Sequence, residues 1–191
     1  MKNLFIFPII LFLILNSCTK NNKTISTQSK IVNDEIESQM IKSYEEGLNE
    51  FNKKFYLEAA KKFNEAEILF PQSEWAPKAS LMAAYSYFSD DYNNDAIREL
   101  ESYLKKYPND KRIVYAHYLM AMAYYNNIVD EKKDLQPLLN SKKKFDFILK
   151  NFPNTDFALD SKFKLDLINE MIASKEMYIA RHYIKKQKWI P

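Results

Sequence analysis

Glycine and cysteine are almost absent from this chain of 191 residues, which contains one of each, Gly47 and Cys18. Phosphate-binding loops, dinucleotide-binding fingerprints and nucleophile elbows each need several glycines, where the backbone turns sharply or approaches a ligand closely. The sequence therefore excludes these classes of site. A single cysteine also excludes an intramolecular disulfide, whatever the redox state of the compartment.

An excess of charge of one sign is missing too. The chain has 28 Lys and Arg residues against 25 Asp and Glu residues, so its formal net charge is only +3. The charges are interspersed along the chain rather than gathered in basic blocks, which argues against a nucleic-acid partner.

Groupings of metal ligands or catalytic residues are also missing. The two histidines, His117 and His182, lie in different parts of the chain, and neither has a second metal ligand at a suitable spacing. The carboxylates are spread along the expected helix surfaces together with lysines, as in helix-face ion pairs. We therefore expect no enzyme activity, no cofactor and no bound metal.

The N-terminus has the features of a lipoprotein signal peptide, expected at 1–17. An apolar run from Leu4 to Leu15 has signal-peptide length and is shorter than the roughly 20 residues that span a bilayer. A short membrane anchor is the alternative. The following LNSC resembles a lipobox, in which the cysteine is lipidated, although Asn16 departs from the usual pattern. We expect lipid attachment at Cys18.

Acyl chains on this cysteine would hold the protein stably on a membrane, because each buried methylene contributes about 0.8 kcal/mol. Thr19 follows the cysteine, in place of the Asp that resembles an inner-membrane retention signal. We therefore expect an anchor in the outer membrane, facing the periplasm. Residues 18–37 are polar with almost no apolar periodicity, and we interpret them as a flexible tether.

From residue 38 onward the apolar residues follow a helical period, without an alternating strand pattern. An aromatic-proline pair occurs at 70–71, 107–108 and 152–153. These pairs recur at intervals near the roughly 34-residue period of tetratricopeptide (TPR) repeats, with an insertion in the third unit. The pattern predicts an all-α, right-handed solenoid of TPR-like helix pairs in units 38–71, 72–108, 109–153 and an incomplete fourth, 154–191.

Each proline ends a unit because it cannot continue a helix. Small residues such as Gly47 lie where paired helices approach closely, and large ones such as Phe63 fill the space between them. The expected helices are 38–53 with 56–69, 73–89 with 93–106, 110–127 with 138–150, and a region at 154–187 with a possible break near Ala173 and Ser174.

Several motifs are more specific than a general TPR signature. The segment FPQSEWAPKASLMAAYSYF, with YAHYLMAMAYYN, FPNTDFALDSKFKLDLINEM and KEMYIARHYIKK further along, resembles the BamD family of the bacterial outer-membrane β-barrel assembly (BAM) machine. The resemblance covers residues 40–189. It implies a scaffold that binds the POTRA domains of BamA, other BAM lipoproteins and unfolded outer-membrane protein precursors. Family members continue past KKQKWIP with further helices, so we expect a truncated chain.

In this family the first helix of each repeat lines a groove, and the resemblance assigns groove positions one by one. Tyrosine suits such a surface, because its ring supplies contact area at low entropic cost and its hydroxyl bonds to water or a peptide backbone. The alternative is that these aromatics form core between repeats, as we expect above all for Tyr85, Tyr103 and Phe145. The predicted groove residues are Ile41, Tyr44, Leu48, Phe51, Ala84, Tyr87, Phe88, Tyr115, Tyr118, Met122 and Tyr125.

The last residues of the chain are basic. The resemblance places Lys186 at the position of an arginine that contacts BamA, beside Tyr183 and Trp189. The alternative is a solvated helix end, where cations interact favourably with the helix dipole. A TPR fold alone names no partner. Another periplasmic TPR lipoprotein, acting as a cell-envelope coordinator or a pilotin, therefore remains the alternative function.

Overall fold

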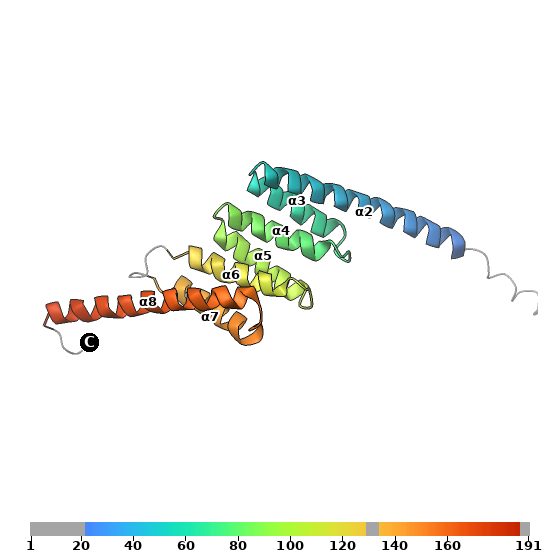
Figure 1. The fold of residues 1–191 in the computed structure, drawn as a ribbon. Helices are drawn as coiled ribbons and strands as arrows, with labels where there is room; N and C mark the ends of the chain where they lie inside the picture. The colour runs from blue at the N-terminus through green and yellow to red at the C-terminus, as the bar shows by residue number, and fades with distance from the viewer. Residues whose placement is uncertain (1–21, 129–133, 188–191) are drawn as a thin grey trace, which may run out of the picture.

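The computed structural model describes residues 22–128 and 134–187, and the regular structure within these ranges is entirely α-helical. The helices follow one another as antiparallel pairs (Figure 1). Their bounds are α2 Asn22–Asn52, α3 Tyr56–Leu69, α4 Ala76–Ser89, α5 Asn93–Lys106, α6 Ile113–Asn126, α7 Gln136–Asn151 and α8 Asp156–Lys185.

The helices are stacked in chain order, so that each packs against its neighbours in sequence. In addition, α4 contacts α6 and α6 contacts α8, which places the first helices of the pairs side by side. Side-chain hydrogen bonds between α3 and α5 join the second helices in the same way. This two-layered stack is a TPR-like solenoid, and the predicted fold class is confirmed.

The observed helix bounds follow the aromatic-proline spacing closely. α3 and α5 coincide with the predicted 56–69 and 93–106. α4 begins three residues later than predicted, because a turn precedes it in which the hydroxyl of Ser73 accepts a hydrogen bond from the Ala76 N–H at 3.1 Å. Pro77 lies in the first turn of α4, where its missing N–H has no helical partner to lose.

Two predictions about the ends of the domain were wrong. The tether predicted for 18–37 is helical from Asn22 onward and forms the beginning of α2. This polar segment contains neither proline nor glycine, so nothing in it interrupts a helix. The break predicted near Ala173 and Ser174 is absent, since α8 runs without interruption through helix-compatible residues. None of the helices in the described ranges combines the length and apolar character that crossing a bilayer requires.

The core consists of three clusters of buried side chains, one where each helix pair meets the next pair. The first joins α2, α3 and α4, the second α4, α5 and α6, and the third α6, α7 and α8. In the first cluster, a Cβ added to Gly47 would lie 2.8 Å from both Cδ1 and Cε1 of Phe63. The predicted close approach at this glycine is confirmed. Tyr103 and Phe145 are fully buried, as predicted.

A buried carboxylate connects the second helices. Glu67 is 5% exposed and accepts hydrogen bonds from Lys106 Nζ at 2.9 Å and from the Tyr107 hydroxyl at 2.8 Å. Burial, with the bond to Glu67, raises the pKa of Tyr107 well above its usual value, so this hydroxyl remains a donor. The carboxylate is thereby solvated by protein groups in place of water.

The turns inside the first two helix pairs, α2–α3 and α4–α5, share one backbone geometry. Lys54 (φ 66°) and Asp91 (φ 60°) are left-handed two residues after the ends of α2 and α4. Gln187 (φ 53°) has the same conformation two residues after α8. The end of α8 therefore resembles the end of a first helix of a pair.

Candidate protein-interaction surface

A row of aromatic rings crosses the repeats, with one ring from each first helix. We call Phe51, Tyr85, Tyr115 and Phe157 the aromatic row. Ring centroids are 5.5 Å apart between Phe51 and Tyr85, 6.5 Å between Tyr85 and Tyr115, and 5.7 Å between Tyr115 and Phe157. All four side chains are half-buried. The row therefore contributes to the core and to the surface along the layer of first helices.

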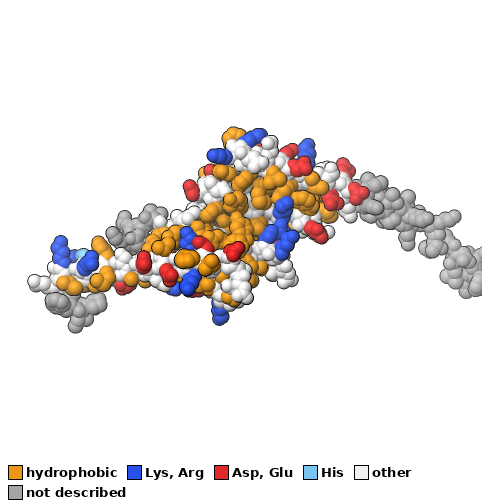
Figure 2. All heavy atoms as spheres, in the orientation of Figure 1, with side chains coloured by type: hydrophobic (Ala, Val, Ile, Leu, Met, Phe, Trp, Pro, Cys, Tyr) orange, Lys and Arg blue, Asp and Glu red, His pale blue; other side chains and the backbone are white. Residues whose placement is uncertain are grey.

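Hydrophobic side chains gather across the middle of one face of the molecule, over the stacked helices (Figure 2). Burial raises the pKa of Tyr115 to about 12, with a smaller contribution from Tyr85. Tyr115 is therefore neutral at physiological pH and offers its ring and hydroxyl group rather than charge. Such side chains bind polypeptide segments well, because they combine apolar area with one hydrogen-bonding tip.

Next to the row, Tyr118 links α6 to α8. Its ring lies 5.1 Å from that of Phe157, and its hydroxyl donates a hydrogen bond to Asp160 Oδ2 at 2.7 Å. One turn further along α8, Lys164 Nζ lies 5.2 Å from the ring centre of Tyr125, within cation–π range. These contacts orient Tyr118 and Tyr125 toward α8.

Most of the predicted groove residues lie at the surface. Leu48 is exposed, and the following are half-buried: Ile41, Phe51, Tyr87, Phe88, Tyr115, Tyr118, Met122 and Tyr125. Two predictions were wrong, because Tyr44 is 3% exposed and Ala84 fully buried. Tyr85, which we expected in the core, is instead half-buried in the aromatic row.

Tyr44 is buried by its aromatic neighbours. Its ring lies 5.2 Å from Phe63 and 5.3 Å from Trp75, and Lys78 Nζ lies over both Tyr44 and Trp75, at 5.0 and 4.7 Å from the ring centres. Trp75, at 36% exposed, covers Tyr44 from the turn before α4. Burial raises the pKa of Tyr44, and the positive charge of Arg112 opposes this rise.

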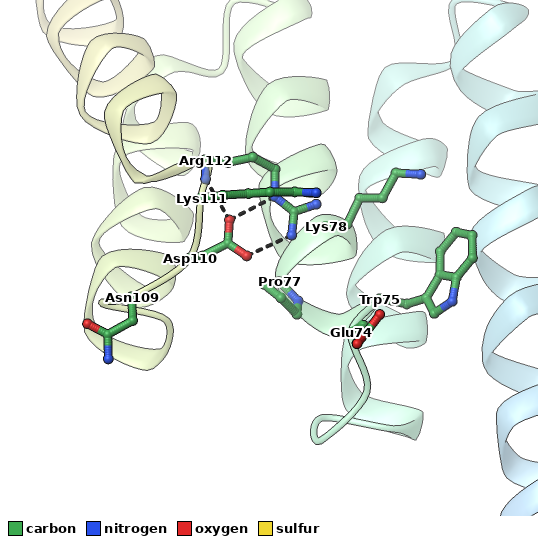
Figure 3. A pocket seen from close by; sticks show the side chains of 8 residues that line it. All are labelled: Glu74, Trp75, Pro77, Lys78, Asn109, Asp110, Lys111 and Arg112. Carbon is green, nitrogen blue, oxygen red and sulfur yellow. Dashed lines mark hydrogen bonds and ion pairs between the residues drawn. The ribbon is translucent and has the colours of Figure 1, made fainter.

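A cleft of about 530 Å³ lies where α4 and α6 begin (Figure 3). One wall carries Asp110, whose carboxylate accepts hydrogen bonds from Arg112 Nε at 2.8 Å, Arg112 Nη2 at 2.7 Å and the Tyr103 hydroxyl at 2.7 Å. Arg112 is the main reason that the pKa of Asp110 lies far below its usual range. The lining residues are Glu74, Trp75, Pro77, Lys78, Asn109, Asp110, Lys111 and Arg112.

His117 is a packing residue rather than part of a polar site. Its ring lies 4.5 Å from that of Phe147 and 6.2 Å from that of Phe152. Burial, with a smaller contribution from the charge of Lys144, lowers its pKa to about 4, so the imidazole is neutral at pH 7. Among the described residues no three His, Cys, Asp or Glu side chains come together as metal ligands.

Residues 36–191 match the sequence profile of a protein family described as YfiO, outer membrane lipoprotein. The chain belongs to this family. Three of the curated proteins similar to this chain, each named outer membrane protein assembly factor BamD, are compared with it here in turn. The protein from Rickettsia prowazekii (strain Madrid E) is 37% identical over 84% of this chain and 64% of its own length.

The protein from Caulobacter vibrioides is 31% identical over 74% of this chain and 47% of its own length. The protein from Neisseria meningitidis serogroup A is 26% identical over 97% of this chain and 72% of its own length. The chain thus spans less than two thirds of the length of the first two relatives. The resemblance to the BamD family seen in the sequence is confirmed.

The predicted lipid-attachment site and the predicted contact with BamA both remain predictions. Cys18 and Trp189 lie outside the described residues. Lys186 is exposed at the C-cap of α8, and Tyr183 is half-buried, with its ring 5.9 Å from that of His182. The end of α8 therefore presents a cation beside two aromatic rings.

Proposed function

We propose that this protein is a non-enzymatic scaffold that assists the assembly of outer-membrane proteins. The observation that carries the proposal is the family match over residues 36–191, supported by relatives that bear the name outer membrane protein assembly factor. The envelope coordinator or pilotin alternative gains no support from these names. In the proposed setting, a lipid on Cys18 holds the domain at the periplasmic face of the outer membrane.

The aromatic row is the proposed contact for unfolded precursor segments. An extended segment that lies along the first helices would meet one ring per repeat, and the tyrosine hydroxyls would bond to its backbone. Because each ring contributes through area rather than charge, such binding tolerates different sequences. This suits a scaffold that receives many precursors.

The end of α8 is the proposed contact for the POTRA domains of BamA. Lys186 and Tyr183 lie there, and Trp189 follows them in the sequence. Tyrosine and tryptophan are enriched among the residues that dominate binding at interfaces, and Lys186 would add a positive charge beside them. Other BAM lipoproteins complete the proposed set of partners.

Co-purification tests the assembly role. The full chain is captured from detergent-solubilised outer membranes, and the expected result is co-capture of a BamA-type barrel protein. Lys186→Glu should reduce this capture, whereas Lys143→Glu on α7 should not. A capture that never contains the barrel protein overturns the proposed function. Cys18→Ala tests the anchor, since the variant should leave the outer-membrane fraction.

The groove is tested with Tyr85→Ala combined with Tyr115→Ala. We expect weaker binding of an unfolded precursor peptide, with helicity unchanged by circular dichroism. Tyr92→Ala is the matched control, because Tyr92 is an exposed tyrosine in the turn between α4 and α5. Loss of helicity in the double variant would show that the two rings act mainly as core.

A further inference from the structure

One long face of α8 is open to solvent. The helix packs on α6 and α7 through the side that carries Leu165 and Ile168, which are buried. Seven exposed residues on the other side form what we call the α8 stripe: Phe163, Leu167, Glu170, Ser174, Met177, Arg181 and Ile184. Four of the seven are large apolar side chains between 47 and 61% exposed. Large apolar side chains gathered on one exposed face favour a protein partner.

The residues of the α8 stripe are spaced alternately by four and three positions along the chain. This alternation is the heptad spacing by which two helices pack along a common seam. The stripe covers three heptads, from Phe163 to Ile184, which is long enough for a paired helix. The pattern therefore indicates that the partner of this face is another helix.

The second half of α8 extends past the other helices of the stack (Figure 1). After Ile172 none of the described residues of this helix is buried. A helical segment without tertiary contacts is only marginally stable in water, because most helical stability in proteins comes from packing an apolar face. A helix lying on the α8 stripe would therefore stabilise this segment.

The charges of the α8 stripe show which helix fits it. Glu170 lies in the first half of the stripe and Arg181 in the second, and neither has an opposite charge three or four positions away in α8. Beside the stripe, the exposed residues Asp166 and Lys185 repeat this order of charge. The face is thus negative toward its start and positive toward its end, which makes it complementary to an antiparallel copy of itself.

We propose that a second copy of this chain packs antiparallel on the α8 stripe. In the register that matches the charges, Glu170 of each copy lies opposite Arg181 of the other. The same register places Leu167 of each copy opposite Ile184 of the other, so charged and apolar residues meet their own kind of partner. The twofold axis makes every contact occur twice.

The polar residues of the α8 stripe set the direction and register of the pair. A parallel pair would place Glu170 against Glu170 and Arg181 against Arg181, and such like-charge contacts disfavour it. In the antiparallel register, Asp166 of each copy also faces Lys185 of the other, and the small Ser174 faces the long side chain of Met177. The apolar residues supply contact area, and the charges select the arrangement.

The proposed dimer leaves the contact proposed for BamA free. By helical periodicity, Tyr183 and Lys186 lie on the side of α8 away from the stripe. The stacked helices of the two copies lie toward opposite ends of the helix pair, because only the first half of each α8 is packed in its own stack. Self-association therefore adds to the proposed function without competing for its surface.

Sedimentation equilibrium of the full chain in density-matched detergent, with micelles in excess over protein, measures the association. The average molar mass should rise from one chain toward two between about 1 and about 100 µM protein. Glu170→Arg and Arg181→Glu should each weaken the dimer by about fivefold or more, because each places like charges opposite one another twice. Glu176→Arg is the matched control, since Glu176 is an exposed charge of α8 outside the stripe.

Exchange of charges tests the register. An equimolar mixture of the Glu170→Arg and Arg181→Glu variants should associate as strongly as the wild type, because unlike charges again face each other in the mixed dimer. Lys186→Glu should leave the dimer unchanged while it reduces capture of the barrel protein, which separates the two interfaces. All of these substitutions replace exposed side chains, and circular dichroism checks that helicity is retained.

A chain that stays monomeric over this range of concentration overturns the proposal and leaves the α8 stripe to a different protein. A dimer that neither charge reversal weakens, or that the mixture of variants does not restore, overturns it as well, since the copies then meet elsewhere or in another register.

Discussion

Tyr118 and Asp160 form the hydrogen bond that joins the third helix pair to α8, with the tyrosine hydroxyl 2.7 Å from Oδ2. The tyrosine belongs to the proposed groove, yet its polar tip is already bonded within the protein. Its ring is therefore available to a partner while its hydroxyl serves the stability of the stack. In the proposed function, one residue would therefore contribute to both binding and structure.

Tyr118→Phe should destabilise the domain by about 1–2 kcal/mol, because it removes a hydrogen bond to a charged, half-buried acceptor. Urea unfolding followed by circular dichroism measures the change. Tyr124→Phe is the control, since the hydroxyl of Tyr124 has no hydrogen-bond partner among the described residues. An equal effect of both substitutions would contradict the assigned role of the bond.

Gly47→Ala should destabilise the domain by about 1–2 kcal/mol, as the new Cβ overlaps the buried ring of Phe63 and the overpacking outweighs the gain in helix propensity. Thermal or urea unfolding gives the size of the effect. Phe63→Leu introduced together with Gly47→Ala should cost less than the sum of the two single changes, because the smaller side chain leaves room for the methyl group. Simple additivity would show that the clash is not the cause.

Asp110→Asn should cost about 2 kcal/mol at pH 7, because Arg112 and Tyr103 lose a charged acceptor. The pKa of Asp110 is held well below its usual range in the folded protein. Its contribution is therefore complete above the unfolded value near 4 and is lost as the pH falls below it. Urea midpoints at pH 7 and pH 3 should show a large difference between wild type and variant at pH 7 and a smaller one at pH 3.

His117 should make stability depend on pH in a separate, higher range. Its folded pKa of about 4 lies below the unfolded value of 6.5, so folding favours the neutral ring. The contribution of His117 to stability is complete above pH 6.5 and falls by at most about 3 kcal/mol as the pH drops toward 4, since the half-buried ring is partly screened by solvent. His117→Leu should flatten urea midpoints measured between pH 7 and pH 4.5. His182→Gln, at an exposed position on α8, should leave the slope unchanged.

The helices could be predicted well because proline and the helical period act locally. α3 and α5 begin and end at the predicted residues, and the aromatic-proline pairs lie between helix pairs. The tether could not be predicted from composition, since a polar segment without glycine or proline is compatible with both coil and helix. In this chain residues 22–37 form the first part of α2.

The candidate surface could be predicted only in part, because burial depends on how helices from different repeats are rotated against one another. Tyr44 and Tyr85 are both tyrosines on first helices, yet Trp75 covers Tyr44 while Tyr85 remains half-buried between Phe51 and Tyr115. The cover comes from a turn that is distant in sequence. Phe157 was missed for the same reason, since only the packing of α8 on α6 brings it into the row.

The order of stacking has a consequence for how the domain forms. Every helix packs mainly on the helices next to it in the chain, and the further contacts join alternate helices. Such a fold has low contact order, so its folding should be fast, with little loop-closure entropy to overcome. Each helix pair can therefore nucleate its neighbour, and the domain can assemble stepwise while the rest of the chain is still being delivered.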